Sequence, residues 1–163
     1  MAGESSFDVV SKIDRMEVDN ALNQTAKELS QRFDFKGTGA SIEWKAEAIE
    51  IRANAEERAK AALEVLREKL VKRQVSLKVL DAGDPKQSGK EFMITVALKE
   101  GIAADLAKTL GAQIRSEAPK SVKVTTLGDT LRVTSKNKDD LQATMVLLRG
   151  TEVDMPLQFI NFR

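Results

Sequence analysis

Apolar and polar positions follow the same order of spacings twice along this chain. From Phe7 onward, apolar residues alternate with polar ones, then recur every three to four residues, and then alternate again through two short runs. A second stretch of helical spacing and a further alternating run end near Val79, and the order restarts at Phe92. Alternation indicates half-buried strands, and the wider spacing indicates amphipathic helices. Each half is therefore predicted to be βαββαβ.

In the first half, strands are expected at 7–13, 41–45, 49–52 and 75–79, with helices at 15–33 and 55–73. Asp14 followed by Glu17 resembles a capping box, and Asn54 followed by Glu57 suggests the second helix start. The segment 81–89 is rich in glycine, aspartate and proline and is predicted to be a linker.

The second half repeats this layout with better turn signals. Strands are expected at 92–98, 122–124, 131–133 and 157–162, with helices at 102–114 and 138–149. Asn137 or Ser135 should cap the last helix, whereas Gly111 weakens the helix in which it lies. The segment 127–130, which contains Gly128, is predicted to be a hairpin turn.

A shift of 82 positions aligns most of the two halves without a gap. It places Ile49–Ile51 on Leu131–Val133 and Leu66 on Leu148. We therefore predict one small unit used twice, at 1–85 and 86–163. The first strands depart from this register, because Phe7 matches Phe92 at a shift of 85.

The fold class follows from these patterns. A helix with one apolar stripe and a strand that alternates can each bury one face only. The expected class is α+β, with two ferredoxin-like βαββαβ repeats. Each repeat would have a four-stranded antiparallel sheet with two helices on one face, and its other face would be open.

The composition limits the kinds of catalysis that the chain can perform. The chain has no cysteine, histidine or tyrosine, which excludes Ser–His–Asp and Cys–His catalysis and disulfides. We expect no enzyme, no catalytic residue, no metal site and no cofactor. With no apolar run long enough to span a bilayer and no signal-peptide pattern, we expect a cytoplasmic protein without a membrane partner.

The distribution of charge favours an anion-binding face in the second half of the chain. Residues 1–85 carry 14 Lys/Arg and 16 Asp/Glu, whereas residues 86–163 carry 12 and 9. By strand parity the open face of the second half contains cations and hydroxyls without an acid, which suits phosphate and sugar contacts. An ordinary solvated sheet face is the alternative. The candidate nucleotide-binding residues on this face are Lys123, Thr125, Arg132 and Thr134, with Lys136 just beyond.

A second candidate is the segment Arg32–Gly39. Its glycines could free backbone N–H groups for a phosphate, with Arg32 and Lys36 adding charge. The alternative is a helix end with a glycine stop.

Near the C-terminus, Ile160 and Phe162 have the opposite parity to Phe159, so they could stack on bases or pack between the repeats.

Several segments resemble the bacterial YajQ family, in order along nearly the whole chain. They are Ser6–Lys12, Arg32–Lys36, Ser88–Lys90, Leu98–Ile102, Lys138–Ala143 and Pro156–Arg163. The resemblance implies two ferredoxin-like subdomains that exchange their first strands, 7–13 and 92–98. It also implies nucleotide binding, with RNA such as tRNA, or cyclic di-GMP, as the ligand. Some family members regulate transcription, so a transcription regulator is an implied protein partner.

Three function hypotheses remain at this point. The first is a non-enzymatic protein that binds RNA or a nucleotide such as cyclic di-GMP. The second is a protein-interaction or transcription-regulatory adaptor that uses its open sheet faces, favoured if Ile160 and Phe162 are exposed together. The third is a magnesium-dependent enzyme on nucleotides, which the missing histidine disfavours.

Overall fold

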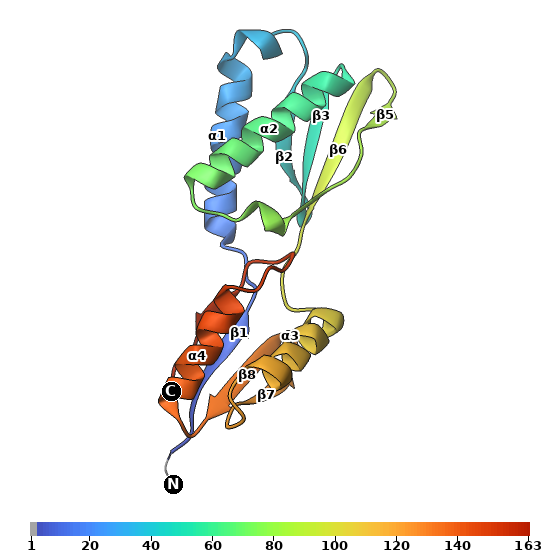
Figure 1. The fold of residues 1–163 in the computed structure, drawn as a ribbon. Helices are drawn as coiled ribbons and strands as arrows, with labels where there is room; N and C mark the ends of the chain where they lie inside the picture. Colours follow the sequence, from blue (N-terminus) through green and yellow to red (C-terminus); the bar gives the residue numbers. More distant parts are fainter. Residues whose placement is uncertain (1–2) are drawn as a thin grey trace. The chain divides into compact units, whose positions relative to one another are not determined.

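The computed structural model of the protein describes residues 3–163, which form two compact units (Figure 1). One unit is Ile13–Lys99. The other, called here the C-terminal unit, contains Glu100–Arg163 together with the start of the chain through Lys12. Among the described residues, no helix is long and apolar enough to cross a membrane.

The Ile13–Lys99 unit consists of one sheet covered by a layer of helices. Its strand order is β2-β3-β6-β4, and a short strand β5 also pairs with β6. Two long helices cover one face of this sheet (Figure 1). The bounds are α1 (Arg15–Gln31), β2 (Ser41–Lys45), β3 (Ala48–Ala53), α2 (Glu56–Lys72), β4 (Leu80–Ala82), β5 (Lys86–Ser88) and β6 (Glu91–Leu98), with 3-10 turns η1 (Phe33–Phe35) and η2 (Leu77–Val79).

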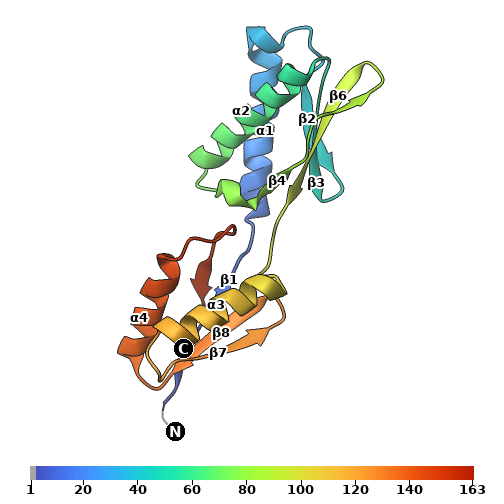
Figure 2. The same ribbon diagram turned by 45° about the vertical axis from the view of Figure 1, so that its right-hand side comes forward.

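The C-terminal unit repeats the architecture with strand order β7-β8-β1-β9. Figure 2 shows its two helices on one face of the sheet. The bounds are β1 (Ser5–Val10), α3 (Ala104–Glu117), β7 (Lys123–Leu127), β8 (Thr130–Ser135), α4 (Lys138–Arg149) and β9 (Gln158–Ile160). The expected α+β class with ferredoxin-like units is confirmed.

The first strands of the two halves are exchanged, as the family resemblance implies. Phe7 of β1 pairs with Val133 of β8, and Ile94 of β6 pairs with Ile51 of β3. Phe7 is fully buried in the core of the C-terminal unit, where α3 and α4 cover it. Each sheet thus obtains a central strand from the other half of the sequence. The duplication at 1–85 and 86–163 stays a prediction about the sequence.

Three local predictions are wrong. The expected strand at 75–79 is instead the turn η2, whose start is capped by the Ser76 side chain, and β4 follows it at Leu80–Ala82. The predicted linker 81–89 contains β5, which turns into β6 through Gly89 at positive φ. Asn54 does not cap α2, because its backbone N–H and side-chain amide are bonded to the loop carbonyls of Thr38 and Gly37.

Two predicted caps are confirmed. The Asp14 carboxylate accepts from the backbone N–H of Glu17, three residues into α1. The Asn137 side chain accepts from the N–H groups of Asp139 and Asp140 at the start of α4. Asp139 and Asp140 therefore lie in a helix first turn, where acidic side chains are favoured by the helix dipole.

A bulge at the C-terminus changes the parity expected for Phe162. Ile160 is opposite Asp8, yet the next backbone pair joins Arg163 to Ser6, so one extra residue is inserted. Asn161 takes the left-handed conformation, with φ of 55°, that accommodates the insertion. Phe162 consequently lies against Phe7, with ring centroids 6.2 Å apart, instead of sharing the face of Ile160.

Candidate functional site

The structure brings together four of the sequence-predicted residues on the open sheet face. Lys123 of β7 is opposite Thr134 of β8, and Thr125 is opposite Arg132. Residues directly opposite each other on paired strands project from the same face. Lys136 follows β8 directly, and its side chain is exposed.

The exchanged strand β1 adds an acid to this face, so the prediction of an acid-free surface is wrong. Asp8 lies opposite Arg132 and accepts from its Nε at 3.0 Å and its Nη2 at 3.5 Å. Asn161 donates to the same carboxylate at 2.8 Å. The Arg132 hydrogen bond holds the pKa of Asp8 below its ordinary value, with a smaller contribution from Asn161, although burial opposes the shift. Arg132 is therefore occupied, and Lys123 and Lys136 carry the remaining positive charge of the predicted set.

The exchange also removes the charge asymmetry predicted between the halves. The C-terminal unit, with the first 12 residues included, contains ten Lys/Arg and ten Asp/Glu. Its formal net charge is zero. In this unit the segment through Lys12 takes the place of the segment that ends at Lys99, and the two segments differ in their balance of basic and acidic residues. An anion site in this unit must therefore arise from local grouping of cations and not from overall charge.

The Asp8–Arg132 pair makes a pH-dependent contribution to stability. Because the folded-state pKa of Asp8 is lowered, the contribution is complete above the unfolded pKa of about 3.9 and is lost as pH falls through the folded value. We expect Asp8→Asn to reduce the free energy of unfolding by about 1 kcal/mol at neutral pH, because Arg132 is one-third exposed and the pair is partly screened. Urea unfolding should show this difference narrowing below about pH 4. A difference that stays constant down to pH 2 would contradict the charge-based explanation.

Arg32 and Lys36 belong to the Ile13–Lys99 unit. Arg32 forms ion pairs with Glu28 at 3.1 Å and Asp34 at 2.6 Å, and these hydrogen bonds hold its pKa above the ordinary value. Lys36 is exposed at the end of η1. The glycine-stop interpretation is wrong, because α1 ends at Gln31 with an Arg32 cap, and Gly37 comes after η1.

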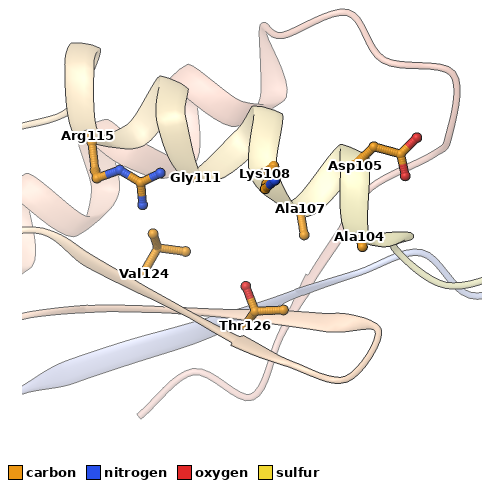
Figure 3. Close-up of a pocket in the computed structure, with 8 residues that line it drawn as sticks. All are labelled: Ala104, Asp105, Ala107, Lys108, Gly111, Arg115, Val124 and Thr126. Atoms are coloured by element: carbon orange, nitrogen blue, oxygen red, sulfur yellow. The ribbon is translucent and has the colours of Figure 1, made fainter.

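A cavity that the sequence did not reveal lies between α3 and the edge strand β7 (Figure 3). Its volume is about 580 Å³, which lies within the range of about 300–1,000 Å³ typical of small-molecule sites. Apolar groups of the helix and the strand form its floor, and two cations stand on the helix side. The lining residues are Ala104, Asp105, Ala107, Lys108, Gly111, Arg115, Val124 and Thr126.

Gly111 opens this cavity. It is buried in the middle of α3, and a methyl group at its position would lie 3.5 Å from the Arg115 guanidinium and 3.7 Å from Val124. A larger side chain would therefore occupy the space between α3 and β7. Figure 3 shows the Arg115 guanidinium extending over Gly111 toward Val124.

The cations of the cavity are not neutralised by neighbouring acids. Lys108 and Arg115 are seven residues apart and so lie on one side of α3. Neither forms an ion pair with any side chain in residues 3–163. The carboxylate of Asp105 points away from β7 (Figure 3). The space thus offers two free cations beside an apolar floor, an arrangement suited to an organic phosphate.

A sequence signal for this cavity existed, although its meaning was not evident. Gly111 interrupts a predicted helix three residues after Lys108 and four before Arg115, so all three share one helix face. A buried glycine in a helix interior usually marks a close approach. Only the position of β7 shows that here it marks an opening. Within residues 3–163, no group of three or more acidic side chains is placed to hold a metal ion.

Comparison with known proteins identifies a family that matches nearly the whole chain. The family described as "Nucleotide-binding protein YajQ-like" matches residues 5–163. A "Nucleotide-binding protein" of Thermobifida fusca (strain YX) is 61% identical, with 100% of both chains covered. A protein with the same name from Nocardioides sp. (strain ATCC BAA-499 / JS614) is 60% identical, and one from Mycobacterium bovis (strain BCG / Pasteur 1173P2) is 53% identical. Each of the latter two alignments covers 98% of this chain and 99% of the relative. The chain therefore belongs to the YajQ-like family of nucleotide-binding proteins.

Proposed function

We propose that this protein binds a nucleotide, without chemistry, in the cavity between α3 and β7. The observation that carries the proposal is the pair of unneutralised cations, Lys108 and Arg115, beside the opening made by Gly111. A base and ribose would rest on the floor formed by Ala107, Gly111 and Val124. A phosphate would accept hydrogen bonds from Arg115 and Lys108, which are stronger than bonds to neutral donors.

The ligand is RNA, such as tRNA, or a nucleotide such as cyclic di-GMP. β7 separates the cavity from the open sheet face, because Val124 and Thr126 alternate with Lys123 and Thr125 along it. A ligand with several phosphates could place one nucleotide in the cavity and cross the edge of β7. Its next phosphates would then meet Lys123 and the hydroxyls of Thr125 and Thr134, with Lys136 beyond the end of β8.

The lining supports binding more than catalysis. Its titratable groups are Asp105, Lys108 and Arg115, and the chain has no histidine or cysteine to act as a neutral-pH base or nucleophile. We propose that any regulatory effect arises when nucleotide binding alters recognition of a protein partner such as a transcription regulator. The cytoplasmic location expected from the sequence remains a prediction.

Titration with fluorescently labelled cyclic di-GMP, tRNA and a mononucleotide at two salt concentrations tests the proposal. We expect at least one ligand to bind, with affinity that falls as salt rises, because binding a phosphate releases counterions. No saturable binding of any of the three at low salt would overturn the proposal. Loss of binding on Lys123→Ala/Lys136→Ala would show that the open sheet face contributes. Arg132 should stay in place, because its removal also releases Asp8.

Two substitutions of Gly111 separate the cavity from the stability of the helix. Gly111→Ala should keep nucleotide affinity and raise the free energy of unfolding by about 0.5–1 kcal/mol, because alanine restricts the unfolded chain and suits a helix interior. Gly111→Leu should abolish nucleotide binding by filling the cavity while the far-UV circular dichroism spectrum stays native. Unchanged affinity of Gly111→Leu, measured by the same titration, would place the ligand elsewhere.

The adaptor alternative is not favoured by the C-terminal residues on which it depended. Ile160 is half-buried beside Asp8, and the bulge at Asn161 turns Phe162 toward Phe7. The two side chains therefore do not form one apolar patch on the open face. An adaptor role without nucleotide binding stays a prediction.

A further inference from the structure

Phe33 is the most exposed large apolar side chain in residues 3–163, at 88%. It lies in η1 directly after α1, where the chain turns toward β2. Phe35, two residues later, is buried in the core of the Ile13–Lys99 unit. The turn therefore uses one phenylalanine as an anchor and projects the other into solvent. Burial of such a side chain is favourable, and Phe33 does not gain that stabilisation.

Hydrogen bonds, an ion pair and cation–π contacts stabilise the turn that carries Phe33. Arg32 grips Asp34 with two hydrogen bonds, of 3.0 and 2.6 Å, and its guanidinium lies 5.1 Å from the ring centroid of Phe35. Arg58 of α2 lies over the same ring at 5.8 Å and contacts the Asp34 carboxylate at 3.6 Å. The backbone that carries Phe33 is therefore held in place, so a ligand that contacts the ring does not have to order the turn.

Cations outnumber acids in the ion-pair network of the turn that carries Phe33. Arg32 and Lys69 both pair with Glu28, and Arg32 and Arg58 both pair with Asp34. Three cations thus share two carboxylates. The hydrogen bond from Lys69 lowers the pKa of Glu28, and that from Arg32 lowers the pKa of Asp34, so both acids are already committed to partners. Next along the chain, Lys36 is exposed and forms no ion pair within residues 3–163.

We propose that this surface, called here the Phe33 corner and made of Arg32–Lys36 with Arg58, binds single-stranded nucleic acid. An unpaired base stacks on the Phe33 ring, and the adjoining phosphate contacts Lys36. An exposed aromatic ring beside surplus cations is the combination that single-strand binding proteins use, and it accepts any base because every base has a flat π-face. A duplex keeps its bases stacked on each other and offers none to the ring. The site belongs to the Ile13–Lys99 unit, and it does not depend on the cavity at α3.

The test compares labelled single-stranded RNA, single-stranded DNA of the same sequence, and a duplex by fluorescence anisotropy. We expect Phe33→Ala to weaken binding of both single strands about tenfold, the effect of losing one stacked base. Phe33→Trp should retain or strengthen binding. Phe162→Ala, which removes another exposed phenylalanine from the other unit, should have no effect on these affinities. Lys36→Gln should reduce the slope of log affinity against log salt for the single strands by about 0.7, the contribution of one phosphate contact.

Several outcomes would overturn this assignment. One is equal single-strand affinity of wild type and Phe33→Ala. Another is an equal loss for single strands and duplex, which would indicate a nonspecific effect. A third is rescue by Phe33→Leu to the same degree as Phe33→Trp, which would indicate an apolar contact, such as one with a protein, instead of stacking. Gly111→Leu, which blocks the cavity, should leave the Phe33-dependent loss unchanged, so failure here is distinguishable from failure of the cavity proposal.

Discussion

Phe7→Ala is expected to unfold the C-terminal unit at much lower urea concentration while leaving the unfolding of the Ile13–Lys99 unit largely unchanged. Phe7 is fully buried in the core of the C-terminal unit, with its ring centroid 5.7 Å from that of Phe159. Truncation of a buried phenylalanine costs about 3–5 kcal/mol. That cost is a large part of the total stability of about 5–15 kcal/mol that is typical of a domain.

A single tryptophan makes the two units separately observable. Trp44 lies on β2, where its indole N–H donates to Asp19, so its fluorescence reports the Ile13–Lys99 unit. Far-UV circular dichroism reports both units. For Phe7→Ala we expect an early transition by circular dichroism and a wild-type transition by fluorescence. The result is not obvious from the sequence, because Phe7 and Trp44 belong to the same half of the chain.

Ile94→Ala is the matched control for the exchange. Ile94 is buried on β6, the strand that the second half of the sequence supplies to the Ile13–Lys99 unit. Its truncation should move the Trp44 fluorescence transition, with a cost of about 2–5 kcal/mol. If Phe7→Ala moved the fluorescence transition and Ile94→Ala did not, the strands would be placed in the opposite sheets.

Local periodicity predicts most elements of this fold, and its failures lie at the sheet edges. The four helices have long apolar stripes at helical spacing, and a pattern of that length fits a helix and not a strand. Val75, Leu77 and Val79 alternate like a strand, yet the chain forms a 3-10 turn there. The strand that follows, β4, is fixed by pairing with β6, in which Asp81 is opposite Ala97. A short alternating run does not specify which separate segment it will pair with. It also does not specify the register of that pairing, since the run alternates in the same way whichever residues lie opposite it.

The exchange of first strands is beyond what local pattern can decide. Both first strands have alternating apolar residues headed by a phenylalanine, and either could fill the centre of either sheet. Only the family resemblance indicated the exchange. The structure adds a polar difference: β1 brings Asp8, whose carboxylate pairs with Arg132, whereas β6 places Thr95 opposite Glu50. Glu50 is instead neutralised by Lys45 and Arg52 of its own unit.

The candidate site was less predictable than the fold, for the same reason. Strand parity correctly grouped Lys123 with Thr134 and Thr125 with Arg132, because these pairs come from one hairpin. It could not show that Asp8, 124 positions away, neutralises Arg132. It also passed over Lys108 and Arg115, because a cation on an exposed helix face is common. They become distinctive only beside the cavity that Gly111 leaves against β7.

Replacing both cations of the cavity should give the largest loss of nucleotide binding. We expect Lys108→Ala/Arg115→Ala to lower affinity at least 100-fold, because a hydrogen bond to a charged group contributes about 1.5–3 kcal/mol. The slope of log affinity against log salt should also fall by about two, since each cation that meets a phosphate contributes about one. Isothermal titration calorimetry with the tightest ligand at several salt concentrations measures both quantities.

Lys120→Ala/Lys138→Ala provides the control for net charge. Both lysines are exposed cations of the same unit that do not line the cavity, so the variant loses the same charge. If long-range attraction dominated binding, the two double variants would weaken it equally. If Lys108 and Arg115 contact the phosphate directly, only their replacement lowers affinity strongly and reduces the salt slope. Equal behaviour of the two variants would therefore remove the cavity as the nucleotide site and leave a diffuse electrostatic surface in its place.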